Sequence, residues 1–316
     1  MATYKQNVGT TVTNFAGNYP GAVEGELWYD STNKDFKYQF STAVGVWSSG
    51  GNVNTARINS GAAGTKSAAL LFGGTPTTAK TESYNGTSWT EVNDLGTARY
   101  GVGGSGLQTA ALAFGGTGNS ALTELWSGTN WTEVNDLNTG RQQIKAGGTS
   151  TSTLAFSGWS PYFAVTESWN GTNWTEVNDL NEARYYAAGA GADNTEGLCF
   201  GGIDQPGGSK VANTESYNGT NWTEVNNLNA TRQAFSGFGS ATSALAFGNE
   251  PVSAATELWN GTNWTEVADL ATARKELAGA GTSNAGGLAI SGAAPSYTTA
   301  TEEWSSTTNT VKTLTD

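Results

Sequence analysis

Residues 166–184 read TESWNGTNWTEVNDLNEAR, and this stretch decides the fold because near-copies of it recur along the chain. Residues 214–232 read TESYNGTNWTEVNNLNATR, and residues 256–274 read TELWNGTNWTEVADLATAR. Each arginine of the sequence ends such a copy or the last part of one, and successive arginines are 42, 42, 43, 48 and 42 residues apart: Arg57, Arg99, Arg141, Arg184, Arg232 and Arg274. A period of about 40–45 residues is typical of repeat proteins.

Each repeat predicts four short strands. The first is made of small residues (187–191), and the second is TAALAFGG (109–116), in which Leu112 and Phe114 alternate with alanines. The third is TELW (123–126) and the fourth NWTEV (130–134). Asn-Gly between the last two strands predicts a two-residue hairpin turn with φ > 0 at both central residues. Four strands per repeat of this length predict an all-β, six-bladed β-propeller with four-stranded blades.

Tryptophan marks two positions of the repeat. One stands ten residues before each arginine: Trp47, Trp89, Trp131, Trp174, Trp222 and Trp264. The other lies in the third strand and is aromatic in all six units: Tyr84, Trp126, Trp169, Tyr217, Trp259 and Trp304. Because these rings repeat with the blades, we interpret them as packing between blades and not as ligand platforms.

These residues resemble the kelch-type propellers over residues 51 to 316. The resemblance is carried by Gly-Gly after the second strand (Gly73-Gly74, Gly115-Gly116 and Gly201-Gly202), by the aromatic residue downstream and by the following tryptophan. The glycine pair is replaced in three blades, by Ser157-Gly158, Gly248-Asn249 and Ser291-Gly292.

Composition excludes several kinds of chemistry. The 316 residues include no histidine and a single cysteine, Cys199, so a Ser-His-Asp relay, a Cys-His relay and a His/Cys metal site are excluded. A net charge of −12 argues against binding to a nucleic-acid backbone or to an anionic membrane surface. No stretch has the apolar length of a membrane span, and the first residues lack a signal-peptide pattern. We therefore expect no cofactor, no metal, no nucleic acid and no membrane insertion.

The predicted domains are an N-terminal attachment arm (1–50) and the propeller (51–316). Two segments are candidates for the strand that completes blade 6. One is Val44–Ser49, which contains Trp47 and would dock beside Trp304; the other is Val311–Leu314. The sequence does not decide between them.

Residues 24–40, EGELWYDSTNKDFKYQF, predict two short strands around a Ser-Thr-Asn-Lys turn. The segment resembles the Gly-x-Leu-Trp-Tyr-Asp…Lys-Tyr hairpin of bacteriophage tail and other virion proteins. This resemblance implies attachment to other virion proteins. The alternative is an extra outer strand pair on the propeller.

The six arginines are matched by six glutamates at the start of the third strand: Glu82, Glu124, Glu167, Glu215, Glu257 and Glu302. The arginine corner and the loop between the second and third strands lie on the same rim, because strand direction alternates. A buried guanidinium needs a carboxylate or carbonyls as partners. We therefore predict a structural Arg–Glu pair in each blade; the alternative is a ring of positive charge that binds an anion.

A catalytic pair of acids should break the repeat, because a reaction needs one site. Six acids do so, and their spacing nominates no pair: Glu182, Asp193, Glu196, Asp204, Glu250 and Glu276. We predict no catalytic residue.

The loops between the second and third strands differ most from blade to blade, and such loops commonly carry recognition. Blade 3 contributes Trp159, Tyr162 and Phe163, and blade 4 has the longest of these loops, with Asp204, Gln205 and Lys210. Tyr185 and Tyr186, just after an arginine, would lie on the same rim. These eight residues are the candidate binding residues; the alternative is that the aromatic ones only cap blade 3.

The two resemblances together imply a non-enzymatic bacteriophage virion protein, a tail fibre or tail-attached adhesin assembled in the host cytoplasm. Its arm would bind other virion proteins, and its rim would bind a host surface glycan or protein. Two alternatives are a capsid-decoration or tail-ring subunit and a propeller glycosidase or polysaccharide depolymerase. The sequence leaves homo-oligomerisation, the receptor and the host open.

Overall fold

The computed structural model describes residues 13–17, 19, 26–40, 45–159, 164–306 and 310–314, and this part of the chain contains strands and no helix. It divides into two compact units. The smaller comprises Met1–Val46 with Ser306–Asp316, and the larger comprises Trp47–Ser305.

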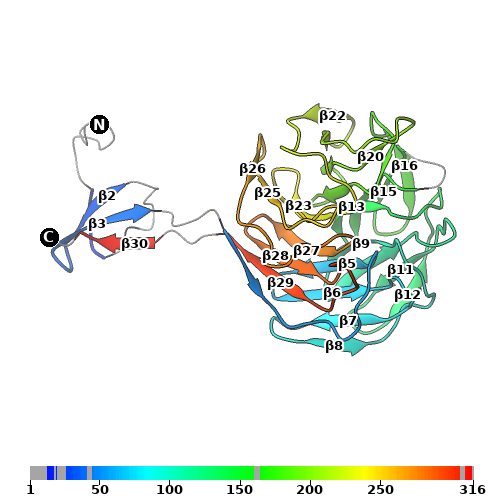
Figure 1. Cartoon of the computed structure of the whole chain (residues 1–316), viewed down its shortest axis with the longest axis horizontal. Helices are drawn as coiled ribbons and strands as arrows, with labels where there is room; N and C mark the ends of the chain where they lie inside the picture. Colours follow the sequence, from blue (N-terminus) through cyan, green and yellow to red (C-terminus); the bar gives the residue numbers. More distant parts are fainter. Residues whose placement is uncertain are drawn as a thin grey trace. The chain divides into compact units, whose positions relative to one another are not determined.

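Six four-stranded antiparallel sheets form the described part of the larger unit (Figure 1), and each is one blade of a β-propeller. Blades 1 and 2 consist of β5 (Gly61–Thr65), β6 (Ala68–Phe72), β7 (Thr81–Tyr84) and β8 (Trp89–Val92), then β9 (Gly103–Leu107), β10 (Ala110–Phe114), β11 (Thr123–Trp126) and β12 (Trp131–Val134). Blades 3 and 4 consist of β13 (Lys145–Thr149), β14 (Ser152–Phe156), β15 (Thr166–Trp169) and β16 (Trp174–Val177), then β18 (Ala188–Ala190), β19 (Gly197–Phe200), β21 (Thr214–Tyr217) and β22 (Trp222–Val225). Blades 5 and 6 consist of β23 (Ser236–Ser240), β24 (Ser243–Phe247), β25 (Thr256–Trp259) and β26 (Trp264–Glu266), then β27 (Ala278–Ser283), β28 (Gly286–Ile290), β29 (Thr301–Ser305) and β4 (Val46–Ser49). This confirms the predicted fold class.

The first strand of each blade lines the centre of the ring. Strand β5 contacts β9, and the contacts continue through β13, β18, β23 and β27 back to β5. Figure 1 shows β5, β9, β13, β23 and β27 near the middle of the propeller and β8, β12 and β26 near its outside. Small residues dominate the first strands because six of them converge on one axis.

Alternation of large and small residues in the second strand packs neighbouring blades together. Leu70 and Phe72 of β6 form one buried cluster with Ala111 and Ala113 of β10. In β10 itself, Leu112 and Phe114 face the other way and pack with Ala155 of blade 3. Each blade therefore offers large side chains to the blade after it and smaller ones to the blade before it.

Tryptophans of the fourth strands connect the blades by hydrogen bonds. Each indole Nε1 donates to the hydroxyl of the threonine that begins the third strand of the preceding blade, at 3.0 or 3.1 Å. The pairs are Trp89–Thr301, Trp131–Thr81, Trp174–Thr123, Trp222–Thr166, Trp264–Thr214 and Trp47–Thr256. The interpretation of these rings as interblade packing is therefore confirmed.

Strand β4 completes blade 6. It pairs with β29 in the sheet order β27-β28-β29-β4, and the ring of Trp47 packs against Trp304 with centroids 5.3 Å apart. The alternative strand, near Val311, is wrong for this position because β30 (Thr310–Thr313) pairs with β3 (Asp35–Phe40) in the smaller unit.

The turn between third and fourth strands differs from the prediction. Tyr84 pairs directly with Trp89, so four residues (85–88) form the loop. Only the glycine, Gly86, has a positive φ, of 90°. Asn85 instead accepts the backbone N–H groups of Thr87 and Ser88 through its side-chain oxygen, at 2.9 Å each. The asparagine stabilises the turn with its side chain and does not itself adopt a left-handed backbone conformation.

The smaller unit is one four-stranded sheet built from both ends of the chain. Its strand order is β1-β2-β3-β30, with β1 (Thr13–Phe15) parallel to β2 (Leu27–Asp30) and the other pairs antiparallel. The predicted boundaries therefore need correction. The propeller does not extend to residue 316, and β4 belongs to the propeller although it lies within the predicted arm.

Asp30 and Lys37 fix the hairpin of the smaller unit. Lys37 Nζ lies 2.8 Å from Asp30 Oδ2, and the same buried carboxylate accepts the backbone N–H groups of Gly17 and Thr32. The hydrogen bond from Lys37 is the largest of the effects that hold the pKa of Asp30 well below its usual range. The Asp and Lys of the hairpin motif therefore hold the hairpin together.

Candidate functional site

The Arg–Glu pairs are confirmed in all six blades. Each guanidinium contacts the glutamate of its own blade: Arg57–Glu82 at 3.0 Å, Arg99–Glu124 at 2.8 Å, Arg141–Glu167 at 2.6 Å, Arg232–Glu257 and Arg274–Glu302 at 2.9 Å, and the close pair Arg184–Glu215. All twelve residues are buried. Buried charges need such partners because desolvation otherwise destabilises them.

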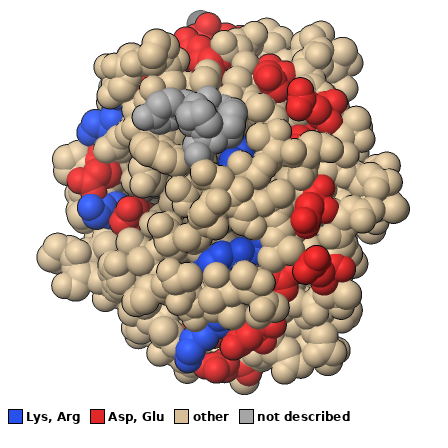
Figure 2. Space-filling view, turned by 90° about the vertical axis from the view of Figure 1, so that its right-hand side faces the viewer, with Lys and Arg blue, Asp and Glu red and all other residues tan. Residues whose placement is uncertain are grey.

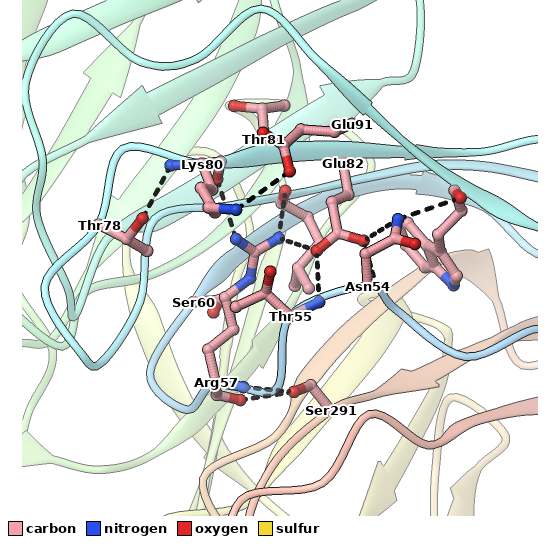
Figure 3. A network of polar contacts seen from close by, with 12 residues as sticks. Asn54, Thr55, Arg57, Ser60, Thr78, Lys80, Thr81, Glu82, Glu91 and Ser291 are labelled. Atoms are coloured by element: carbon pink, nitrogen blue, oxygen red, sulfur yellow. Dashed lines mark hydrogen bonds and ion pairs between the residues drawn. The ribbon is translucent and has the colours of Figure 1, made fainter.

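Backbone groups complete each pair, as Figure 3 shows for blade 1. The guanidinium of Arg57 also donates to the carbonyl of Lys80 at 3.2 Å. The second oxygen of Glu82 accepts the backbone N–H of Asn54 at 2.6 Å and its side-chain amide at 2.9 Å. The terminal guanidinium nitrogens thus bind within the blade, although the buried Nε of Arg57 donates no hydrogen bond, and the buried arginines are not presented to an external anion.

The arginine backbone joins neighbouring blades. The residue at the second position of each Gly-Gly motif donates its N–H to the arginine carbonyl of the following blade, for example Gly74 to Arg99 at 2.9 Å. Ser291 replaces the first glycine in blade 6, keeps a φ of 57° and bonds the carbonyl of Arg57 through its hydroxyl at 2.6 Å. Loss of the glycine is therefore offset by a side-chain hydrogen bond.

The arginine corners and the loops between second and third strands share one rim, as predicted. Gln142 pairs with Trp159 through backbone hydrogen bonds of 3.2 and 2.7 Å. In blade 4, β17 (Arg184–Tyr185) pairs with β20 (Ile203–Asp204). Candidate binding residues that are distant in sequence therefore meet on this rim.

Three of the candidate aromatic residues form a cluster on the rim. The rings of Trp159 and Tyr185 meet edge to face with centroids 4.5 Å apart, and Tyr185 lies 5.3 Å from Tyr186. All three side chains are half-buried. We call Trp159, Tyr185 and Tyr186 the rim cluster. Tyr162 and Phe163 lie outside the described residues.

The residues of the blade 4 loop mainly form hydrogen bonds within the rim. The Asp204 carboxylate accepts the N–H of Ser209 at 2.6 Å, and the backbone N–H of Gln205 bonds the carbonyl of Ala183 at 2.9 Å. Lys210 Nζ reaches the carbonyl of Glu250 in the next blade at 3.0 Å. These residues share the rim with the cluster and hold its loops in place.

A ring of backbone hydrogen bonds lies where the rim meets the central channel. Each arginine is followed two positions later by a residue with positive φ, between 48° and 66°: Asn59, Gly101, Gln143, Tyr186, Ala234 and Glu276. Among the described residues, five interblade N–H to carbonyl bonds of 2.7–3.2 Å connect them. About 20 Å³ of free space lies at this ring, so the channel is narrow on the rim side.

Glu276 and Tyr186 are titratable members of this ring. Burial raises the pKa of Glu276, and Lys275 opposes the shift. Burial also raises the pKa of Tyr186, with Glu276 and Tyr185 adding to the effect. Lys275 forms a close ion pair with Glu250, and this contact raises the pKa of the lysine. Charged groups therefore lie beside the rim cluster.

The other asymmetric acids have structural partners. Glu182 accepts the side-chain amide of Asn213 at 3.0 Å, and Asp193 accepts the backbone N–H of Thr195 at 2.7 Å. Glu196 accepts the N–H of Ala192 at 2.9 Å and that of Ala241 at 3.1 Å. These bonds account for three acids that the repeat does not explain.

The interior of the ring holds a cavity that the sequence interpretation missed. A volume of about 250 Å³ is lined by first-strand residues of all six blades and reaches exposed residues at strand ends, such as Thr149. A deeper part of about 80 Å³ includes Lys145 in its wall. The sequence signal was present, because lysine stands where other blades have glycine, alanine or serine.

Charge is sparse elsewhere. On the face in Figure 2 most residues are uncharged, and acidic side chains lie mainly along its margin. The described residues contain no cluster of three or more His, Cys, Asp or Glu side chains suited to a metal ion. In that same part of the chain, no helix has the length and apolarity to cross a membrane.

Comparison with known proteins supports the fold alone. No protein-family model matches the sequence, and no curated protein matches it by sequence. The chain is similar to the solved "Structure of YjhT", with a TM-score of 0.66 and 12% sequence identity, over 84% of this chain and 99% of that one. At this identity the similarity extends to the β-propeller architecture and not to a binding activity.

Proposed function

We propose that this protein is a non-catalytic recognition module of a bacteriophage particle, a tail fibre or tail-attached adhesin with a kelch-type propeller. The smaller unit would attach to other virion proteins, and the rim would bind a host surface glycan or protein. The hairpin with Asp30 and Lys37 supports the first part, since it carries the residues that resemble virion proteins.

The rim cluster is the observation that carries the recognition role. Trp159 lies in a loop that departs from the repeat, and its ring contacts that of Tyr185. Beside it, the side-chain oxygen of Gln142 is buried and accepts no hydrogen bond. A sugar ring offers both an apolar face for aromatic rings and hydroxyl groups for such an acceptor. A glycan is therefore the ligand class that these groups suit best.

Binding to host cells and to a glycan array tests this role. We expect Trp159→Ala and Tyr185→Ala to weaken binding about five- to thirtyfold, because each removes aromatic contact worth about 1–2 kcal/mol. Tyr297→Ala is the matched control: this 44% exposed tyrosine lies in the equivalent loop of blade 6. If the wild-type protein binds neither host cells, glycans nor virion proteins, the proposal is wrong.

Localisation on the particle separates the adhesin from an architectural subunit. Antibody labelling of virions at a tail tip or fibre supports the adhesin. Labelling over the capsid or the tail ring instead supports the capsid-decoration or tail-ring alternative.

Glu276 favours one second candidate, a glycosidase or depolymerase. Its half-buried carboxyl group has a raised pKa and lies near Tyr186, at the edge of the rim cluster. A raised pKa suits a general acid. Release of reducing ends from host polysaccharide, abolished by Glu276→Gln, would support this activity over simple binding.

A further inference from the structure

Lys145 is an exception in the innermost layer of the propeller. It begins β13, and the residues that begin the first strands of the other blades are small: Gly61, Gly103, Ala188, Ser236 and Ala278. Blade 3 therefore places a long cationic side chain at a position where the other five blades have a small side chain or, in glycine, none.

The cavity around Lys145 opens to solvent at one end and is otherwise uncharged. Its deep part, about 80 Å³, is lined by residues of all six blades. First strands are edge strands on this side, so their backbone N–H and carbonyl groups face the cavity, and its wall is mostly polar. Lys145 is the sole charged residue among the described residues that line this part or the 250 Å³ above it.

No side chain neutralises the ammonium group. The part of the chain that the structure describes gives Lys145 no hydrogen bond and no ion pair, and burial lowers its pKa to about 8. Cys199 is the titratable group that acts on the pKa of Lys145. Burial raises the pKa of its thiol to about 12, so the thiol remains neutral near pH 7. Glu276 and Tyr186 line the small space at the ring of backbone bonds, which Lys145 also borders.

We propose that the central cavity is a binding site for a compact oxyanion, a carboxylate or a phosphate, with Lys145 as its counter-charge. A water molecule needs roughly 10–15 Å³ of cavity, so 80 Å³ accommodates an anion of four or five heavy atoms. Backbone N–H groups of the first strands would supply further hydrogen bonds. The site differs from the rim cluster in its residues, and only Tyr186 of that cluster borders the small space next to Lys145.

Thermal unfolding of the full-length protein tests the site with inorganic phosphate and with acetate as probes. Measurements at pH 7 and constant ionic strength remove general screening effects. We expect either probe to raise the unfolding temperature of the wild type, and calorimetric titration to give a dissociation constant at least tenfold weaker for Lys145→Gln. A response to phosphate alone assigns the site to phosphate, and a response to acetate alone assigns it to carboxylates.

Lys80→Gln is the matched control, since Lys80 is an exposed lysine paired with Glu91 at 3.1 Å. This variant should respond to the probes as the wild type does. Equal responses of wild type and Lys145→Gln, or no response of the wild type to either probe, would overturn the proposal.

A second measurement needs no substitution at Lys145. Reductive methylation with ¹³C-formaldehyde gives each lysine an NMR signal, and one signal should titrate near pH 8 in the absence of the probes. Phosphate or acetate should move that midpoint upward, because a bound anion favours the charged amine. A midpoint unchanged by both probes also contradicts the site.

Discussion

At the scale of single residues, the repeat made some contacts predictable from the sequence and left others undetermined. The Arg–Glu pairs were predictable because a buried guanidinium requires a carboxylate and the spacing offers one in every blade. The partners of Asn85 were not, since an Asn-Gly sequence is compatible with more than one turn geometry. The sequence showed Lys145 as an exception to the repeat. It did not show where the lysine side chain points, because that depends on how the six first strands converge.

The lowered pKa of Lys145 predicts a pH-dependent difference in stability between wild type and Lys145→Met. The pKa of Lys145 in the folded state, about 8, lies below the 10.5 of an unperturbed lysine, so the unfolded state binds more protons between these values. The wild type should therefore gain stability relative to the variant as pH rises from about 8 to 10.5. At pH 7 without an added anion, we expect the variant to be up to about 3 kcal/mol more stable, from about 1.4 kcal/mol per pKa unit.

Urea unfolding from pH 6 to 11 checks this expectation, with Lys80→Met as the control for a general loss of charge. Glu276 and Tyr186 titrate in both proteins, so their contributions cancel in the comparison, whereas the pKa of Cys199 depends on Lys145 and its titration is part of the difference. A difference that stays constant over the whole pH range would contradict the assignment of a lowered pKa to Lys145.

At the scale of strands, closure of blade 6 was the ambiguous point. Two short segments, one near each end of the chain, were both compatible with a fourth strand. The structure chooses β4 because Trp47 reproduces the contacts of the other five tryptophans, including the bond to a threonine hydroxyl. The constant spacing of ten residues between tryptophan and arginine was the sequence feature that pointed there. Local composition could not decide it, because register depends on the partner strand.

Thr256→Val tests whether this closing contact resembles those within the continuous chain. The change removes the acceptor of Trp47 at nearly constant volume and should lower the free energy of unfolding by about 1 kcal/mol. Thr166→Val, which removes the acceptor of the buried Trp222 bond, should lower it by about 1–3 kcal/mol, because that indole is shielded from water. Denaturant titration measures both values. A Thr256→Val variant as stable as the wild type would show that the closing bond contributes nothing.

At the scale of the whole molecule, the repeat predicted the architecture and only the general location of recognition. Loops outside the repeat have no second copy to constrain them, so the contact between Trp159 and Tyr185 could not be read from the sequence. The pairing of both chain ends in one small sheet could not be predicted either, because β3 and β30 are separated in the sequence by the whole propeller. Such distant pairing leaves no local pattern.

Division into two units predicts that the propeller folds alone. A fragment of residues 45–306 keeps every described blade strand, including β4, and should unfold cooperatively within about 5 °C of the full-length propeller transition. A fragment of residues 50–306 is the matched comparison, because it lacks β4 and Trp47. It should unfold at a clearly lower temperature in a circular dichroism melt. Equal melting of the two fragments would contradict the role of β4 in the ring.

Placement of β4 has a consequence for the order of events during translation. The ribosome makes this strand early, yet its neighbour β29 emerges about 250 residues later. Until then, the nascent chain holds Trp47 without its site, and blades 1 to 5 can assemble only as an open arc. Completion of the circle therefore awaits nearly the whole polypeptide, and a chain truncated before β29 leaves its earliest blade strand without a partner.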